Sequence, residues 1–312
     1  MKGSSSWQAQ ELMKSVDAIG QSKHAAKAEA RASGKETWHD VAKDLGVHSF
    51  ATKEAYTDVW KSVADHAKSE FGVRDITKLT TEHVSSYLAG KVEDGVAKAT
   101  FAQYASACEK LEVALNRYSE QHKTGQTYQF DLSAVRETAK TELEAFNGSR
   151  AYADPSAVVR AIPDGKLQLA ATLQHEGGCR VREAAEIKTA QLGGIHVDKG
   201  REFGVVKTVG KGGSKVDVKI SVETYERLVS QIAASEKGVF KVSADDVRDA
   251  LKESAAATGQ DYQGSHGLRW NFAQDRMDEL QEKGFTYEQS LTVVSEEMGH
   301  HRSDITEHYL GK

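Results

Sequence analysis

The stretch His266-Gly267-Leu268-Arg269 opens a run, 266–282, whose apolar spacing predicts a helix. A separation of three residues on a helix places the imidazole of His266 and the guanidinium of Arg269 on one face. Three more polar segments accompany this pair in the same half of the chain. They are Gly178 to Glu183, which contains Arg180; a glycine-rich hairpin at 210–214, which bears Lys211; and Gly299-His300, followed nine positions after the histidine by Tyr309.

Each segment by itself has an ordinary structural interpretation. Arg180 and Glu183 can form a surface ion pair at i,i+3 spacing, and a glycine-rich hairpin with lysines can be only a turn. His266 and Arg269 can belong to a helix start that is capped by Ser265. Tyr309 can be a packing aromatic.

Together and in this order, the segments resemble the catalytic domain of the tyrosine recombinase (phage-integrase) family. The resemblance covers about residues 152–310, and a helical region at 49–122 is similar in composition to the core-binding domain of that family. Matched residue by residue, the resemblance implies a catalytic set consisting of Arg180, Lys211, His266, Arg269, His300 and Tyr309.

The chemistry of a phosphodiester favours the same residue types. Guanidinium groups suit phosphate oxygens and remain charged at any working pH, which fits Arg180 and Arg269, with His300 as a third donor. A tyrosine with a pKa near 10 is ionised in only about one molecule in a thousand at pH 7, so Tyr309 needs a base, for which His266 is the candidate. Lys211 can protonate the leaving 5′-oxygen. A phosphotyrosine link keeps the energy of the broken bond, so we expect no cofactor, ATP or metal.

Some positions depart from the family pattern. Trp270 stands where the family often has histidine, and Met298 where leucine is common. The printed chain stops at Lys312, whereas many members continue with a helix that docks into the neighbouring subunit. Either the chain is truncated after Tyr309 or another element joins the subunits, and in the second case we expect the helical lead-in, Ser4 to Leu45, to be the free segment that exchanges between them.

The spacing of apolar residues predicts a mainly α fold with one small β-sheet, and the resemblance implies that its two domains form a DNA clamp. The expected division is a helical lead-in at 1–48, a helical core-binding domain at 49–122, a linker at 123–150 and the catalytic domain at 151–312. Strands are predicted at 203–209 and 215–220. Helices are predicted near 51–71, after Gly95, and at 132–146, 155–161, 166–175, 222–234, 244–257, 266–282 and 287–298.

The composition places limits on compartment and partner. The two cysteines form no spaced framework, and no stretch approaches the length of a membrane span, so a reduced, cytoplasmic protein without a membrane partner is expected. The formal net charge of -5 argues against DNA binding, but residues 199–219 carry six lysines and arginines against two acidic residues. Lys53, Lys98 and Lys215 are candidate contacts to DNA phosphates.

The resemblance thus implies a site-specific recombinase that acts on double-stranded DNA with a specific site, as a homo-tetramer on paired sites. A topoisomerase of type IB shares this chemistry, and a catalytically silent DNA-binding protein shares the fold, so both stay open as alternatives. A metal site built from His300, His301, His308, Asp304 and Glu307 is a further alternative, although the spacing matches no known ligand motif.

Overall fold

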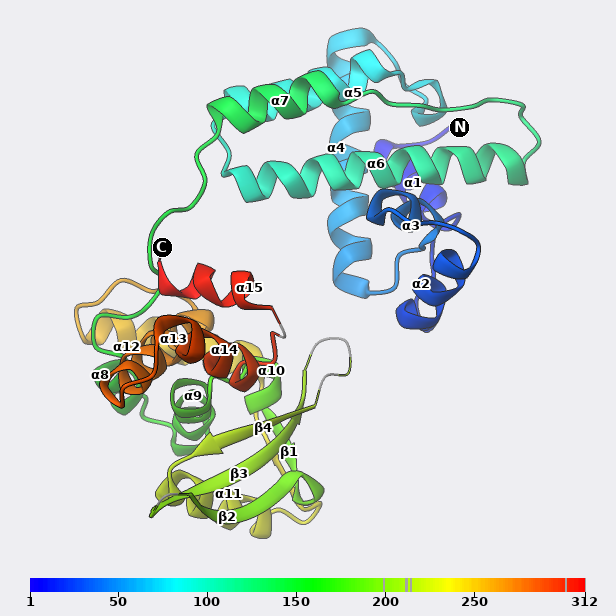
Figure 1. The fold of residues 1–312 in the computed structure, drawn as a ribbon. Coiled ribbons are helices and arrows are strands. Elements are labelled where there is room, and N and C mark those ends of the chain that lie inside the picture. Colours follow the sequence, from blue (N-terminus) through cyan, green and yellow to red (C-terminus); the bar gives the residue numbers. More distant parts are fainter. Residues whose placement is uncertain (199, 211–212, 214, 301, 312) are drawn as a thin grey trace. The chain divides into compact units, whose positions relative to one another are not determined.

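The structure, a computed structural model, describes residues 1–198, 200–210, 213, 215–300 and 302–311. The chain divides into two compact units, Met1–Phe146 and Asn147–Lys312 (Figure 1). The described residues are mainly helical with small antiparallel sheets, which confirms the predicted fold class. None of their helices is both long enough and apolar enough to span a bilayer.

The first unit is built from helices. They are α1 (Ser5–Met13), α2 (Lys23–Ala32), α3 (Trp38–Asp44), α4 (Phe50–Phe71), α5 (Thr81–Glu93), α6 (Lys98–Gln121) and α7 (Ser133–Glu142). The long helix α4 begins because the Ser49 hydroxyl accepts from the main-chain N–H of Thr52, and it ends at Gly72, whose φ of 69° is left-handed. At the centre of the unit, Trp60 is fully buried and its indole Nε1 donates to the carbonyl of Ala107 on α6, at 2.7 Å.

The lead-in is not a free segment. Leu12 and Met13 of α1 are buried in the same core as Trp60. The side chain of Gln8 bonds to the carbonyl of Arg74 and to the N–H of Ile76, both at 2.8 Å. The expectation that residues 4–45 are available to exchange is therefore wrong for α1, because removing it would open the core of the first unit.

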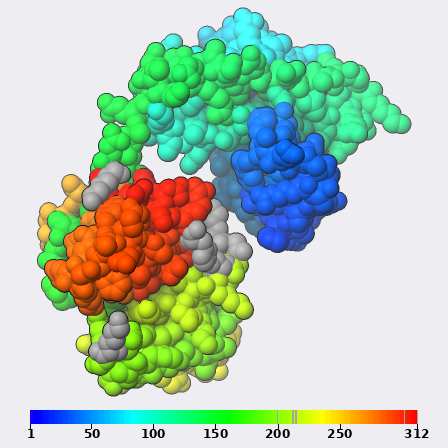
Figure 2. All heavy atoms as spheres, viewed as in Figure 1, coloured from blue at the N-terminus to red at the C-terminus, as the bar shows by residue number. Residues whose placement is uncertain are grey.

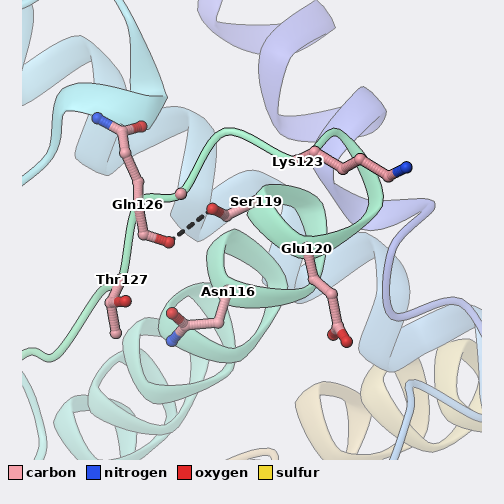
Figure 3. A pocket seen from close by; sticks show the side chains of 7 residues that line it. Asn116, Ser119, Glu120, Lys123, Gln126 and Thr127 are labelled. Carbon is pink, nitrogen blue, oxygen red and sulfur yellow. Dashed lines mark hydrogen bonds between the residues drawn. The ribbon is translucent and has the colours of Figure 1, made fainter.

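The segment after α6 also belongs to the first unit. Tyr128, Phe130 and Leu132 alternate with exposed residues and are buried against the helical core, and α7 follows them there. The turn at the end of α6 is fastened by the Ser119 hydroxyl, which donates to the carbonyl of Gln126 at 2.5 Å beside an open hollow of about 500 Å³ (Figure 3). The contacts thus divide the chain after Phe146, later than the expected linker begins.

The second unit mixes helices and strands. Its helices are α8 (Pro155–Arg160), α9 (Gly165–Gly177), α10 (Val181–Ala184), α11 (Val222–Ala233), α12 (Ala244–Ala257), α13 (Ser265–Glu282), α14 (Tyr287–Glu297) and α15 (Ser303–Glu307), with a 3-10 turn η3 (His308–Leu310). Its strands are β1 (Glu186–Lys188), β2 (Leu192–Asp198), β3 (Arg201–Val209), β4 (Lys215–Ile220) and β5 (Val239–Lys241).

The described strands form two sheets where one was predicted. β2, β3 and β4 make a three-stranded antiparallel sheet, and β1 pairs with β5. The predicted strands correspond to β3 and β4. β1 and β5 are three residues long, too short for an alternating pattern to be visible, and β2 contains Gly193 and Gly194, which weaken its strand signal.

Helix α9 lies at the centre of the second unit. It contacts α8, α10, α11, α12, α13 and β4, and Leu169, Ala170 and Leu173 from it are fully buried. A second apolar cluster joins α13 and α14 to the segment that carries Tyr309. In the space-filling view α13, α14 and α15, coloured orange to red, lie against one another (Figure 2).

Candidate active site

Tyr309 lies in η3, directly after α15, and its side chain is only 8% exposed. Its hydroxyl is 2.7 Å from Nε2 of His266, which stands at the start of α13. The Tyr309 ring also lies 5.1 Å from the ring of His300, and the guanidinium carbon of Arg269 is 5.9 Å from the Tyr309 ring centroid. Four of the six residues that the sequence selected are therefore in direct contact.

Arg269 is one of the most deeply buried polar residues of the described chain, at 2% exposure. Its guanidinium donates to the carbonyl of Gly178 with Nη1, and with Nη2 to the carbonyl of Met298 at 2.5 Å and to Nε2 of His300 at 2.9 Å. Among the described residues its buried Nε has no hydrogen-bond partner. Arg269 thus ties the segment before Arg180 to the segment that contains His300.

Two glycines shape the backbone around this guanidinium. Gly178 ends α9 at a φ of 63°, and a Cβ placed there would lie 2.5 Å from the ring of Phe272. Gly299 has a φ of 65°, and its Cβ would lie 2.6 Å from a methyl group of Val216. Both positions need the left-handed conformation and the absence of a side chain, which explains why glycine stands next to each polar segment.

Arg180 is the N-cap of the short helix α10 and is partly exposed. Its Nη1 lies 2.8 Å from Oε1 of Glu183, and its main-chain N–H donates to Oε2 of the same carboxylate at 2.9 Å. The ion pair considered from the sequence is therefore present. The charge of Arg180 also reaches the other residues of the site, since it lowers the pKa values of His266 and Arg269.

His266 is held in its neutral form. Burial lowers its pKa to about 4, and the positive charges of Arg269 and Arg180 act in the same direction. A neutral imidazole can accept a proton, so His266 is available as a base at pH 7. The helix start differs from the expected one: Gly264 is the N-cap of α13, and Ser265 is its first helical residue.

Burial lowers the pKa of Arg269, and the nearby charge of Arg180 lowers it further. An arginine starts so far above neutral that it stays charged at working pH. The deeply buried cation is offset by its carbonyl acceptors and by the Tyr309 ring, over whose face it lies.

Lys211 lies outside the described residues. The strands that flank its loop are β3 and β4, paired in antiparallel register up to Val209 and Lys215. Lys215 is exposed at the start of β4. Two other cations of the basic run are paired with carboxylates, Arg201 with Glu279 at 2.5 Å and Lys219 with Glu297 at 3.3 Å, which reduces the positive surface that the sequence suggested.

The other two lysines proposed for DNA make contacts within the chain. Nζ of Lys53 lies 2.6 Å from Oδ2 of Asp17, and this pairing lowers the pKa of the aspartate. Nζ of Lys98 donates to the carbonyl of Lys140 at 2.8 Å. Both side chains would have to exchange these partners for a phosphate. In the part of the chain that the structure describes, no three His, Cys, Asp or Glu residues form a group that could hold a metal ion.

Sequence reasoning missed two residues that hold Tyr309. The indole of Trp270, which is 1% exposed, lies 5.4 Å from the Tyr309 ring, and Nε2 of Gln274 donates to the Tyr309 carbonyl at 2.9 Å. His266, Trp270 and Gln274 are spaced by four residues and share one face of α13. That spacing is present in the sequence, but it does not predict a contact with Tyr309 until the fold shows that Tyr309 faces this side of the helix.

The fold recurs in solved structures that match most of the chain. The XerH site-specific recombinase bound to a palindromic difH substrate is 14% identical, with a TM-score of 0.61 over 97% of this chain and 90% of that chain. A lambda integrase dimer bound to a COC′ core site is 18% identical, with a TM-score of 0.54 over 92% and 77%. The chain has the tyrosine recombinase fold.

The Tn1549 transposon integrase in complex with transposon right-end DNA has the same tyrosine recombinase fold. It is 13% identical, with a TM-score of 0.51 over 96% of this chain and 94% of that chain. No protein-family model matches the chain, and no curated protein matches it in sequence. The evidence for the tyrosine recombinase fold is therefore the order of the short motifs and the similarity of the structure to these solved structures.

Proposed function

We propose that this protein is a site-specific DNA recombinase that cuts and rejoins duplex DNA through a 3′-phosphotyrosine intermediate. The observation that carries the proposal is the hydroxyl of Tyr309, 2.7 Å from the neutral imidazole of His266 and beside the buried guanidinium of Arg269. The fold it shares with recombinases that were solved on DNA supports the same function.

The proposed reaction exchanges one phosphoester bond for another. The Tyr309 oxygen attacks the scissile phosphorus while its proton passes to Nε2 of His266, and the bond from phosphorus to the 5′-oxygen breaks. The departing 5′-oxygen takes a proton, for which Lys211 is the proposed donor. The reverse reaction with a 5′-hydroxyl from the partner strand reseals the DNA. The number of phosphoester bonds is conserved, so no energy source is consumed.

The phosphate would be held by the two arginines of the site. Arg180 is partly exposed and can offer its planar guanidinium to a phosphate oxygen at the cost of its partly buried ion pair with Glu183. Arg269 has its terminal nitrogens occupied by protein acceptors and would act on the phosphate as a fixed positive charge. Preorganised donors of this kind contribute roughly 3–4 kcal/mol each to transition-state stabilisation in comparable oxyanion sites. His300 accepts from Arg269 and so acts on the phosphate through that guanidinium.

The acting species would be a homo-tetramer on two paired DNA sites, since exchange of strands needs two duplexes to be cut in one complex. A lambda integrase of the same fold was solved as a tetramer bound to a Holliday junction. The exposed Lys215 is the proposed phosphate contact of the sheet, and Lys53 and Lys98 are proposed contacts of the first unit.

The test is covalent capture on DNA. The protein is incubated with a fragmented DNA library, denatured, and the DNA that stays attached to protein is sequenced. Tyr309→Phe should bind DNA as the parent does and form no adduct, because only the nucleophilic oxygen is lost. An adduct that persists in Tyr309→Phe would place the nucleophile elsewhere. Relaxation of any supercoiled plasmid by single protein molecules would favour a topoisomerase.

A further inference from the structure

Both ring nitrogens of His300 lie within hydrogen-bond distance of another side chain. Nε2 lies 2.9 Å from Nη2 of Arg269, and Nδ1 lies 3.0 Å from the hydroxyl oxygen of Thr306. Thr306 stands on α15, three residues before Tyr309, and it is fully buried. Burial of its hydroxyl excludes water as a competing partner at this position.

These two contacts determine which nitrogen of the ring carries the proton. An arginine can only donate, so Nε2 of His300 must accept from Arg269 and must be unprotonated. A neutral imidazole then carries its proton on Nδ1, and that N–H donates to the oxygen of Thr306. The doubly protonated ring is excluded, because it would have no lone pair to face the guanidinium.

We infer that Thr306 is a positioning residue for the proposed strand cleavage: by accepting from Nδ1–H, it holds the His300 ring in the orientation in which Nε2 accepts from the guanidinium of Arg269. The inference rests on the proposed function for its catalytic consequence, but the hydrogen bonds belong to the protein without DNA. Thr306 on α15 and Tyr309 on η3 share the short segment 303–310, so this segment carries both the nucleophile and the residue that orients the partner of Arg269.

The consequence of losing the hydroxyl follows from the geometry. Without an acceptor at Thr306, the Nδ1–H of His300 is left buried without its partner, so the ring is no longer held with Nε2 facing Arg269. When the ring turns toward another acceptor, the guanidinium loses one of the contacts that hold it. Removing the partner that orients a functional histidine costs about 10- to 100-fold in activity at metal sites, and we expect a loss of similar size here.

The experiment uses Thr306→Val, which keeps the shape and removes the hydroxyl, and Thr306→Ser, which restores it. The matched control is Thr292→Val, because Thr292 lies on the neighbouring helix α14 and its hydroxyl donates to the main-chain carbonyl of Glu288. Long-range ¹H–¹⁵N spectra of protein labelled on histidine nitrogen report the tautomer, and His300→Gln identifies the His300 signals by their disappearance. Thermal unfolding checks that each variant is folded.

The first readout is the spectrum of the protein without DNA. The parent, Thr306→Ser and Thr292→Val should show a protonated Nδ1 and, on His300, an unprotonated Nε2 with the resonance of a nitrogen that accepts a hydrogen bond. In Thr306→Val the Nε2 resonance should move toward that of a nitrogen without a donor, because the ring no longer faces Arg269. An unchanged Nε2 resonance in Thr306→Val would overturn the inference, as would a parent that is protonated on Nε2.

The second readout is the rate of covalent adduct formation on DNA. Thr306→Val should be slower by about 10- to 100-fold, Thr306→Ser should recover most of the rate, and the control should equal the parent. A parent that forms adducts at the same rate as Thr306→Val overturns the catalytic consequence of the inference. A parent that forms none overturns the proposed function instead, and the spectra decide the tautomer independently.

Discussion

The two arginines of the site should differ sharply in what they contribute to stability. Arg269 is buried and donates to two main-chain carbonyls and to His300, whereas the side chain of Arg180 is 32% exposed and pairs with Glu183. Hydrogen bonds from a charged donor contribute about 1.5–3 kcal/mol each, and the buried acceptors left behind by Arg269→Ala lose their partner. Relief of the buried charge offsets part of this, so we expect a loss of about 3–5 kcal/mol.

Arg180→Ala removes one partly exposed ion pair at i,i+3 spacing, for which about 1 kcal/mol or less is expected. In a domain of this size, the loss at Arg269 corresponds to a fall in Tm of about 10 °C, and the loss at Arg180 to about 2–4 °C at most. The adduct assay cannot separate the two residues, because both substitutions should abolish cleavage. The free energy of unfolding should separate them.

The assay is urea unfolding followed by far-UV circular dichroism and by tryptophan fluorescence. Trp270 is the one tryptophan after residue 146, so its signal reports on the second unit. The midpoint should shift with an unchanged slope, which indicates that stability and not the extent of unfolding has changed. Equal losses for the two variants, or a loss below about 1 kcal/mol for Arg269→Ala, would refute the view that Arg269 holds the segments of the site together.

Further outcomes concern chemistry and the first unit. Lys211→Ala should cleave ordinary DNA slowly and recover on DNA with sulfur at the bridging 5′ position, and an equal defect on both would make Lys211 a phosphate contact. Cleavage should continue in excess EDTA, because arginines neutralise the phosphate; loss that a divalent ion restores would contradict this. The pKa of His266 in the folded protein is about 4, below the ordinary 6.5, so its base form persists as the pH falls. The cleavage rate should therefore show no decline centred on pH 6.5 between pH 8 and 5. A decline there that is absent in His266→Ala would contradict the low pKa. Leu12→Ala should destabilise the first unit by about 2–5 kcal/mol, as measured by urea unfolding; no change would mean that α1 is free after all.

The sequence by itself determined the local secondary structure and the order of the polar motifs along the chain. Helices such as α12 and strands such as β4 were predicted at their observed bounds, because apolar spacing is a local property that each segment carries with it. The polar motifs were found in the same way, since His266 and Arg269 are three residues apart and share a helix whatever surrounds them.

Only the tertiary structure decided what each side chain faces. From the sequence, Lys53 was a candidate contact to a DNA phosphate. In the fold its Nζ binds Asp17, which is 36 residues away in the chain. The sequence predicts the same role for Arg269 and Arg180. The fold buries Arg269, which donates to the carbonyls of Gly178 and Met298, and leaves Arg180 partly exposed. The lead-in at 4–45 was predicted to be a free segment, but Leu12 lies in the same core as Trp60. Burial and long-range contacts depend on which surfaces the folded chain brings together, and a pattern of spacings along the sequence does not contain that information.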